Sequence, residues 1–195
     1  MSLISSKCSI LQATRLIVLM GISAWLGALY AEDMKGLRVY SASTELQHGM
    51  YYLDAQLDYD LSQAAIDALD SGVPLTFELE AEIFQPRKWL WDKSLASFNQ
   101  RYQVVYHALT QQYVVTKINS GIQNSYSRRN TALLTMGRIN HLPLVEKKAL
   151  PEDENYRVRL RFSLDINALP VPMRPWAYIN SEWLLASEWF EWEID

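Results

Sequence analysis

The stretch LTFELEAEI, residues 75–83, decides the fold, because apolar and polar side chains alternate along its whole length. One face of this segment carries the apolar residues Leu75, Phe77, Leu79, Ala81 and Ile83. The other face carries Thr76 and the three glutamates Glu78, Glu80 and Glu82. A period of two predicts a β-strand with one buried face and one solvent-facing face.

Two other segments alternate in the same way, YYLDAQLDY at residues 51–59 and YRVRLRF at residues 156–162. Strands that are buried on one face only are typical of antiparallel sheets. Less regular β-rich runs cover residues 37–45, 102–109, 112–118 and 183–192. Together these segments predict about seven strands.

Two helices are expected between the strands. The first begins at Asp60, where Gln63 three residues later completes a capping-box pattern, and it ends at Gly72. The second covers residues 128–136, whereas residues 140–155 are expected to form an exposed loop. One-sided antiparallel strands must stack in two layers or pack under helices, which predicts a mainly β fold in which the apolar faces of residues 51–59, 75–83 and 156–162 meet in one core. We expect an antiparallel β-sandwich with one or two helical crossovers.

The first 31 residues resemble a secretory signal peptide. Lys7 and Arg15 precede an uncharged stretch, LIVLMGISAWLGAL at residues 16–29, and Ala31 ends the run. The stretch is shorter than the roughly 20 residues of a spanning helix, so cleavage near Ala31 is favoured over an uncleaved N-terminal anchor. We therefore predict a periplasmic protein with a single β-rich domain over residues 32–195. Inner-membrane anchoring that faces the periplasm is the alternative.

Charge and cysteine content exclude several functions. The chain of 195 residues has a formal net charge of −4, and without Lys7 and Arg15 the remainder carries −6. An acidic domain is a poor ligand for nucleic acid and disfavours broad adsorption to anionic lipid. Cys8 is the only cysteine, so residues 32–195 can form neither a disulfide nor a thiolate metal site.

No pattern in the sequence indicates a catalytic, cofactor or metal site. His107 lies in a predicted strand, where a surface histidine is more common than a general base or a metal ligand. Asp54, Asp58 and Asp60 lack the glycine and bidentate glutamate of a calcium loop, and their spacing fits an exposed strand face. We expect no catalytic residues, no cofactor and no metal.

The glutamate row of residues 75–83 has a counterpart in Arg157, Arg159 and Arg161, which share one face of residues 156–162. If the two strands are neighbours, the rows form a ladder of cross-strand ion pairs. Each pair would contribute only about 0–1 kcal/mol but would favour the correct register. The alternative is that the arginines face an acidic partner.

Six tryptophans remain after residue 31, and Trp89 and Trp91 form a pair apart from the others. In an extended segment their indoles point to the same side, and the neighbours Arg87, Lys88 and Asp92 hold the segment near solvent. Exposed aromatics among polar residues are typical of binding surfaces. We expect Arg87, Trp89 and Trp91 to form a partner-binding surface, with core packing of both indoles as the alternative.

Four blocks of the chain resemble a proteobacterial family of unknown function, the family DUF4390. They are GVPLTFELEAEIFQPRKWLWD (residues 72–92), YHALTQQYVV (106–115), YRVRLRFSLDINALPVPMRP (156–175) and WLLASEW (183–189). The resemblance implies an exported envelope protein without an established activity and supplies no catalytic residues. It also implies an association with a membrane sensor histidine kinase.

These observations favour a non-enzymatic binding or accessory module whose partner is a protein of the cell envelope. A sensor kinase is the partner that the resemblance implies, and nucleic acid is not expected. Contact with the membrane is expected if the N-terminal segment stays uncleaved. Two other functions remain open, a periplasmic carrier of a lipid or peptide and a hydrolase with a dispersed site near His107.

Overall fold

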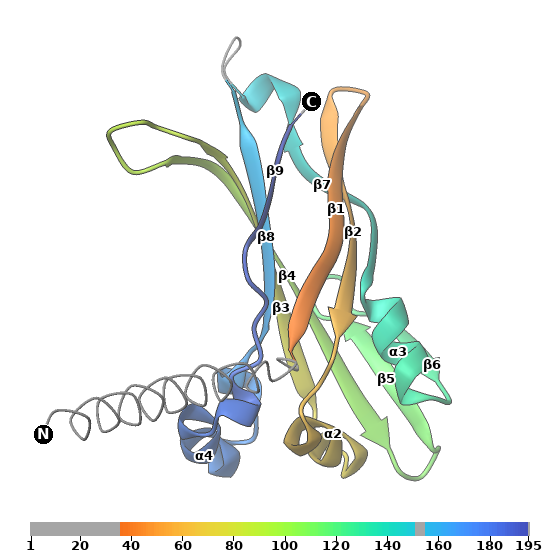
Figure 1. Ribbon diagram of the computed structural model, residues 1–195. Coiled ribbons are helices and arrows are strands. Elements are labelled where there is room, and N and C mark those ends of the chain that lie inside the picture. The colour runs from red at the N-terminus through yellow and green to blue at the C-terminus, as the bar shows by residue number, and fades with distance from the viewer. Residues whose placement is uncertain (1–35, 151–154, 195) are drawn as a thin grey trace, which may run out of the picture. The chain divides into compact units, whose positions relative to one another are not determined.

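The computed structural model of the protein describes residues 36–150 and 155–194. They form two antiparallel sheets, one with the strand order β1-β2-β7 and one with the order β6-β5-β4-β3-β8-β9 (Figure 1). The strands are β1 (Leu37–Gln47), β2 (Met50–Tyr59), β3 (Leu75–Gln85), β4 (Lys93–His107), β5 (Gln112–Lys117), β6 (Ile122–Tyr126), β7 (Arg138–Glu146), β8 (Arg157–Leu164) and β9 (Phe190–Glu193). The mainly β fold class is confirmed, with nine described strands in place of about seven.

The main core lies between the two sheets. Tyr59 of β2 places its ring 5.0 Å from the rings of Phe77 in β3 and Phe162 in β8, so aromatic contacts join the layers. Around them lie buried side chains from the predicted apolar faces, namely Leu53, Leu57, Leu75, Leu79 and Leu160. The alternation therefore assigned the buried faces of these strands correctly.

Two residues that we expected in this core, Tyr51 and Val158, belong to a smaller buried cluster. They pack there with Ile83 and Leu150. Tyr51 and Val158 lie toward the opposite ends of their strands from Tyr59 and Phe162, so pairing carries them to the far end of the sandwich. The prediction of one core for all these residues is wrong in this respect.

Both predicted helices connect the two sheets. Helix α2 (Gln63–Asp70) leads from β2 to β3, and α3 (Arg129–Met136) leads from β6 back to β7. The expected cap at Asp60 is wrong, because Ser62 accepts a hydrogen bond of 3.2 Å from the backbone N–H of Ala65. Strand β2 runs to Tyr59, which leaves Asp60 in the connection that precedes the helix.

Several boundaries differ from the prediction. Most of the expected loop over residues 140–155 belongs to β7 and the 3₁₀ helix η1 (Lys147–Ala149). Pro143 lies in β7, an edge strand, where the missing N–H disrupts no ladder on the open side. Most of residues 183–192 is not a strand, because Trp183 ends the 3₁₀ helix η4 (Ser181–Trp183) and the short strand β9 begins only at Phe190. Strand β4 begins at Lys93, well before Tyr102, because its first half pairs only with β3.

The proline-rich residues 168–175 turn rather than extend. They include η3 (Val171–Met173), follow η2 (Ile166–Ala168) and lead into α4 (Arg174–Ile179). The unit from Lys35 to Asp195 is compact by itself and contains both buried clusters, as a domain that folds independently does. The predicted signal peptide or anchor over residues 1–31 lies outside the described residues.

Candidate binding surface

The hairpin of β3 and β4 extends beyond the sheet that holds it. Strand β8 pairs with β3 as far as Phe84, and the final β3–β4 pair joins Gln85 and Lys93. Residues 86–92, called the hairpin tip from here on, follow that final pair. Figure 1 shows the hairpin projecting away from the two sheets at the upper left. No third strand of the described chain therefore supports the hairpin tip.

Large apolar side chains of the hairpin tip lie in solvent. Trp89 is 95% exposed, Trp91 is 93% exposed and Leu90 is 68% exposed. Burial of one such side chain contributes about 1.5–3 kcal/mol to the free energy of folding, and the exposed side chains of the tip do not make this contribution. The two indoles therefore do not close one end of the core.

The local conformation of the hairpin tip differs from the expected extended segment. The chain bends at Lys88, Trp89 and Leu90. The backbone N–H of Arg87 donates a hydrogen bond of 3.2 Å to Oδ1 of Asp92, which joins the two sides of the tip. The expectation of an extended chain was wrong because these residues connect two antiparallel strands and must reverse direction.

The charge of the hairpin tip is opposite to that of the whole chain. Arg87, Lys88 and the adjoining Lys93 carry positive charge, and Asp92 is the single acid among them. This leaves a local net charge of +2 on a chain of net charge −4. All four side chains belong to exposed residues. The tip therefore combines exposed aromatic surface with positive charge.

The arginine row of β8 lies beside the glutamate row of β3, as the ladder predicts. The register pairs Glu80 with Arg161 and Glu82 with Arg159. Arg161 donates to both oxygens of Glu80 at 3.0 and 3.1 Å, and Arg159 Nε donates to Glu82 at 2.7 Å. The third pair differs from the expectation, because Arg157 reaches Glu191 of β9 at 3.2 Å. Glu78 accepts a hydrogen bond from Asn99 of β4.

Trp189 covers this ladder from the β9 side. The guanidinium carbon of Arg161 lies 4.5 Å from an indole ring centroid of Trp189, and that of Arg159 lies 4.9 Å from it. Desolvation raises the pKa of Glu82, but hydrogen bonds from Ser94 and Arg159 and the Arg159 charge outweigh it, so the pKa is lowered. The charges of Arg159 and Arg161 are thus neutralised within the domain, which disfavours the alternative of an acidic partner.

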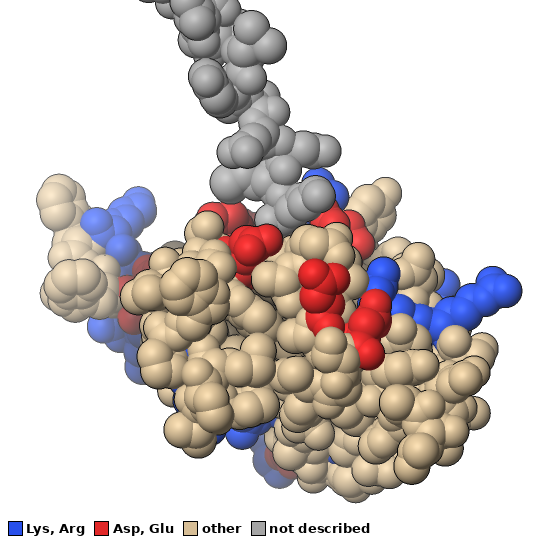
Figure 2. All heavy atoms as spheres, turned by 90° about the horizontal axis from the view of Figure 1, so that it is seen from below, with Lys and Arg blue, Asp and Glu red and all other residues tan. Residues whose placement is uncertain are grey.

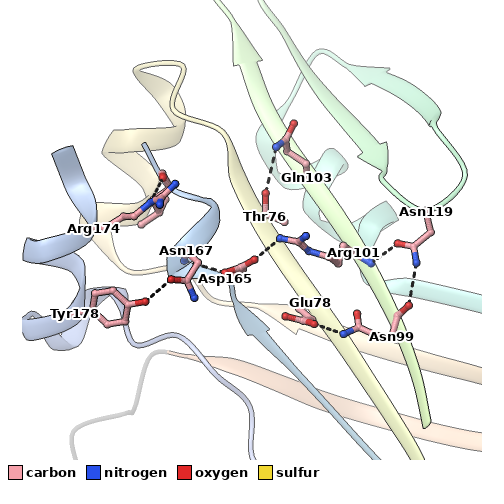
Figure 3. Close-up of polar contacts among 11 residues, drawn as sticks. Thr76, Glu78, Asn99, Arg101, Gln103, Asn119, Asp165, Asn167, Arg174 and Tyr178 are labelled. Carbon is pink, nitrogen blue, oxygen red and sulfur yellow. Dashed lines mark hydrogen bonds and ion pairs between the residues drawn. The ribbon is translucent and has the colours of Figure 1, made fainter. Parts of the chain in front are cut away.

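A second group of polar contacts fastens the segment after β8 to the large sheet (Figure 3). Arg101 of β4 forms an ion pair with Asp165, and Asp165 also accepts a hydrogen bond of 2.9 Å from the N–H of Asn167. The hydroxyl of Tyr178 donates to Asn167 at 2.6 Å. Arg174 donates to the carbonyl of Leu169 at 2.8 Å. These contacts fix the position of α4 at one end of the sandwich.

The end of the domain that carries α4 has its own exposed apolar side chains. Val171, Trp176, Ile179 and Leu184 are between 57% and 76% exposed. Figure 2 shows that most of this end carries no charged side chain and that acidic residues gather along one border. The sequence pattern did not distinguish these residues. The spacing of three between Trp176 and Ile179, which fits one helix face, is the signal that could have suggested them.

The histidines and aspartates do not come together in a site. His107 ends β4 in an exposed position, and its imidazole has no hydrogen bond or ion pair with another described residue. His141 stacks on Tyr52 with ring centroids 3.8 Å apart. Asp54 accepts a hydrogen bond from the backbone N–H of His141, and Asp58 pairs with Arg38.

Metal-ligating clusters and membrane-spanning helices are both absent from the described residues. Within residues 36–150 and 155–194, no group of three or more His, Cys, Asp or Glu side chains is placed to hold a metal ion. No helix in the same part of the chain has the length and apolar character needed to cross a membrane.

The fold and its exposed surfaces define a small antiparallel β-sandwich domain with a projecting aromatic hairpin. Comparison with family models places residues 34–193 in a single family, described as a domain of unknown function (DUF4390). The chain belongs to this family, which the four sequence blocks had indicated. No curated protein and no solved structure matches the chain.

Proposed function

We propose that this protein is a non-enzymatic binding module of the bacterial cell envelope that attaches to its partner through the hairpin tip. The observation that carries the proposal is the exposure of Trp89 and Trp91, at 95% and 93%. Tryptophan is enriched where proteins bind partners, because its ring buries a large area and its N–H still finds a polar contact.

The architecture of the hairpin suits a role in which the hairpin presents a binding surface to a partner. Its base is held by the ion pairs of Glu80 and Glu82 with β8, and the hydrogen bond from Arg87 to Asp92 closes the tip. A binding surface on a well-paired strand hairpin loses less conformational freedom on association than a surface on a loose loop. The hairpin therefore supports binding more directly than the exposed His107 supports catalysis.

The sequence features of export support a location in the periplasm. Residues 1–31 have the layout of a secretory signal, and the family resemblance implies an accessory role beside a membrane sensor kinase. In this proposal the domain works at the inner membrane, where such a kinase resides. We expect mass spectrometry of the purified protein to find an N-terminus within a few residues of Glu32.

The experiment compares the chain that starts at Glu32 with its Trp89→Ala/Trp91→Ala variant, W89A/W91A. Both proteins are sedimented with an inner-membrane fraction of the source bacterium. The variant should lose sedimentation with the membranes while its circular dichroism spectrum and urea unfolding stay unchanged.

Trp176→Ala, W176A, is the matched control, because Trp176 is also exposed but lies in α4. It should sediment like the parent protein. Equal sedimentation of W89A/W91A and the parent would contradict the proposal, as would a parent protein that stays in the supernatant.

A further inference from the structure

We propose that the hairpin tip binds the anionic surface of a lipid bilayer. In this arrangement Trp89, Leu90 and Trp91 enter the headgroup layer, and Arg87, Lys88 and Lys93 lie over lipid phosphates. The inference rests on the proposed function and specifies the ligand of the same surface. Contact is confined to the tip, because the acidic charge of the remaining domain disfavours broad adsorption to anionic lipid.

The apolar residues of the tip match the chemistry of the headgroup layer. Tryptophan is enriched at that depth because its ring is apolar and its N–H still reaches a polar partner. Trp89, Leu90 and Trp91 are consecutive and lie at or directly after the bend of the tip, so they form its most exposed apolar surface.

The charged residues distinguish a lipid surface from a protein surface. Lysine is depleted in protein–protein interfaces, whereas lysine and arginine beside aromatic residues favour anionic lipid. Here Lys88 and Lys93 flank the aromatic residues, and the local net charge is +2. Attraction to anionic headgroups acts within about 10 Å at moderate salt, so it concerns the residues next to the bilayer.

The position of the tip allows contact with a flat surface. Beyond the pair of Phe84 and Arg157, β3 and β4 are the only described strands that continue toward the tip, and β5 joins β4 much further along, at Tyr102. The tip therefore projects from the domain (Figure 1). A planar bilayer can bind a projecting hairpin tip without a pocket of complementary shape.

The other exposed apolar region, at the end with α4, is a weaker candidate. Trp176 and Ile179 are exposed there, but the charged residues at its border are mainly acidic (Figure 2). Anionic lipid would repel such a border. This region therefore supplies the matched control for the tip.

The test measures binding of residues 32–195 to vesicles that contain no protein. One set of vesicles contains phosphatidylglycerol and phosphatidylethanolamine, and a second set contains only phosphatidylcholine. The parent domain should sediment with the first set and bind the second much more weakly. High salt should weaken binding to the first set.

Two double variants test the two parts of the surface. W89A/W91A should bind the anionic vesicles about a hundredfold more weakly. Lys88→Glu/Lys93→Glu should bind them at least about tenfold more weakly. W176A and the charge-matched control Arg128→Glu/Arg138→Glu, which changes two exposed arginines elsewhere, should bind within about twofold of the parent.

Each outcome decides between the two proposals. Binding that is lost in the tip variants and kept in the controls supports the lipid surface. The domain could instead fail to bind protein-free vesicles but sediment with native inner membranes in a way that depends on Trp89 and Trp91. That result would overturn the lipid inference and leave the proposed function intact, and it would indicate a protein partner. A domain that binds neither overturns both.

Discussion

Arginine and tryptophan side chains occur both beside the paired part of the β3–β4 hairpin and in its tip, but their surroundings differ. Beside the paired part, Arg159 and Arg161 of the neighbouring strand β8 are neutralised by glutamates of β3 and stack on Trp189. In the tip, Arg87 precedes Trp89 and Trp91 in the sequence, and both indoles lie in solvent. Arginine beside tryptophan thus forms a closed internal contact in one region and an open surface in the other.

The difference arises from the neighbouring strand. Strand β8 runs alongside β3 from Phe77 to Phe84, and its arginines alternate in register with the glutamates. Within the described residues, β8 does not pair with β3 beyond Phe84, and the aromatic and charged residues of the hairpin tip are exposed. The end of β8 that pairs with Phe84, at its first residue Arg157, therefore marks the boundary between residues that stabilise the domain and residues that are available to bind.

The largest expected effect concerns the core beneath the ladder. Phe77 is 1% exposed and lies on the face of β3 opposite Glu78 and Glu80. Phe77→Ala should lower the free energy of unfolding by about 3–5 kcal/mol, as measured by urea denaturation. Leu109→Ala is the control, since Leu109 is fully exposed in the turn that follows β4 and its replacement should change the stability little. Equal stability of both variants would show that β3 faces the other way.

The ladder itself should contribute less. Glu82 and Arg159 are less than one-third exposed, so their coupling in a double-mutant cycle with Glu82→Gln and Arg159→Met should be about 1 kcal/mol. The corresponding cycle with Arg38 and Asp58, which are 66% and 51% exposed, should give a smaller coupling. A coupling near zero for Glu82 and Arg159 would mean that this ladder only guides the register.

The sequence predicted the ladder because alternation assigns each residue to a face, and complementary rows then imply adjacent strands. It did not predict that Arg157 would pair with Glu191, because β9 is only four residues long and the sequence does not reveal that it lies beside β8. Pro143 similarly concealed β7 within an expected loop, because proline is tolerated only at an edge that the sequence does not reveal. Local pattern thus identified faces but not the edges of the sheets.

For the candidate surface, the sequence distinguished Trp89 and Trp91 through their charged neighbours. It did not reveal the exposed Trp176, because the contacts that position α4 join Arg101, Asp165 and Tyr178 across distant parts of the chain. Whether a tryptophan is buried depends on such long-range contacts. Three of the six tryptophans after residue 31 are exposed, so the residue type alone does not predict burial.

Acid should weaken the ladder. The pKa of Glu82 is lowered in the folded protein from its ordinary value of 4.5. As the pH falls, Glu82 therefore takes up a proton in the unfolded chain before it does so in the folded protein. The contribution of Glu82 to stability is therefore complete above the ordinary pKa and is lost as the pH falls through the folded-state pKa. Urea unfolding at pH 7 and pH 3 should show a smaller acid loss in Glu82→Gln than in the parent. Glu188→Gln, an exposed control, should lose as much stability as the parent.

The smallest expected effect is that of the tip on stability. W89A/W91A removes two large side chains, but both are more than 90% exposed and contribute little burial to the folded state. Surface substitutions of this kind usually change the free energy of unfolding by no more than about 0.5 kcal/mol.

Trp183→Ala makes the same chemical change at a residue that is 5% exposed, and it should cost about 3–5 kcal/mol. The difference between the two variants in their free energy of unfolding, measured by urea denaturation, shows whether the tip contributes to the stability of the core. If W89A/W91A unfolds as easily as Trp183→Ala, the indoles are part of the folded core. The hairpin tip would then be a structural element, and the boundary at the end of β8 would have no functional meaning.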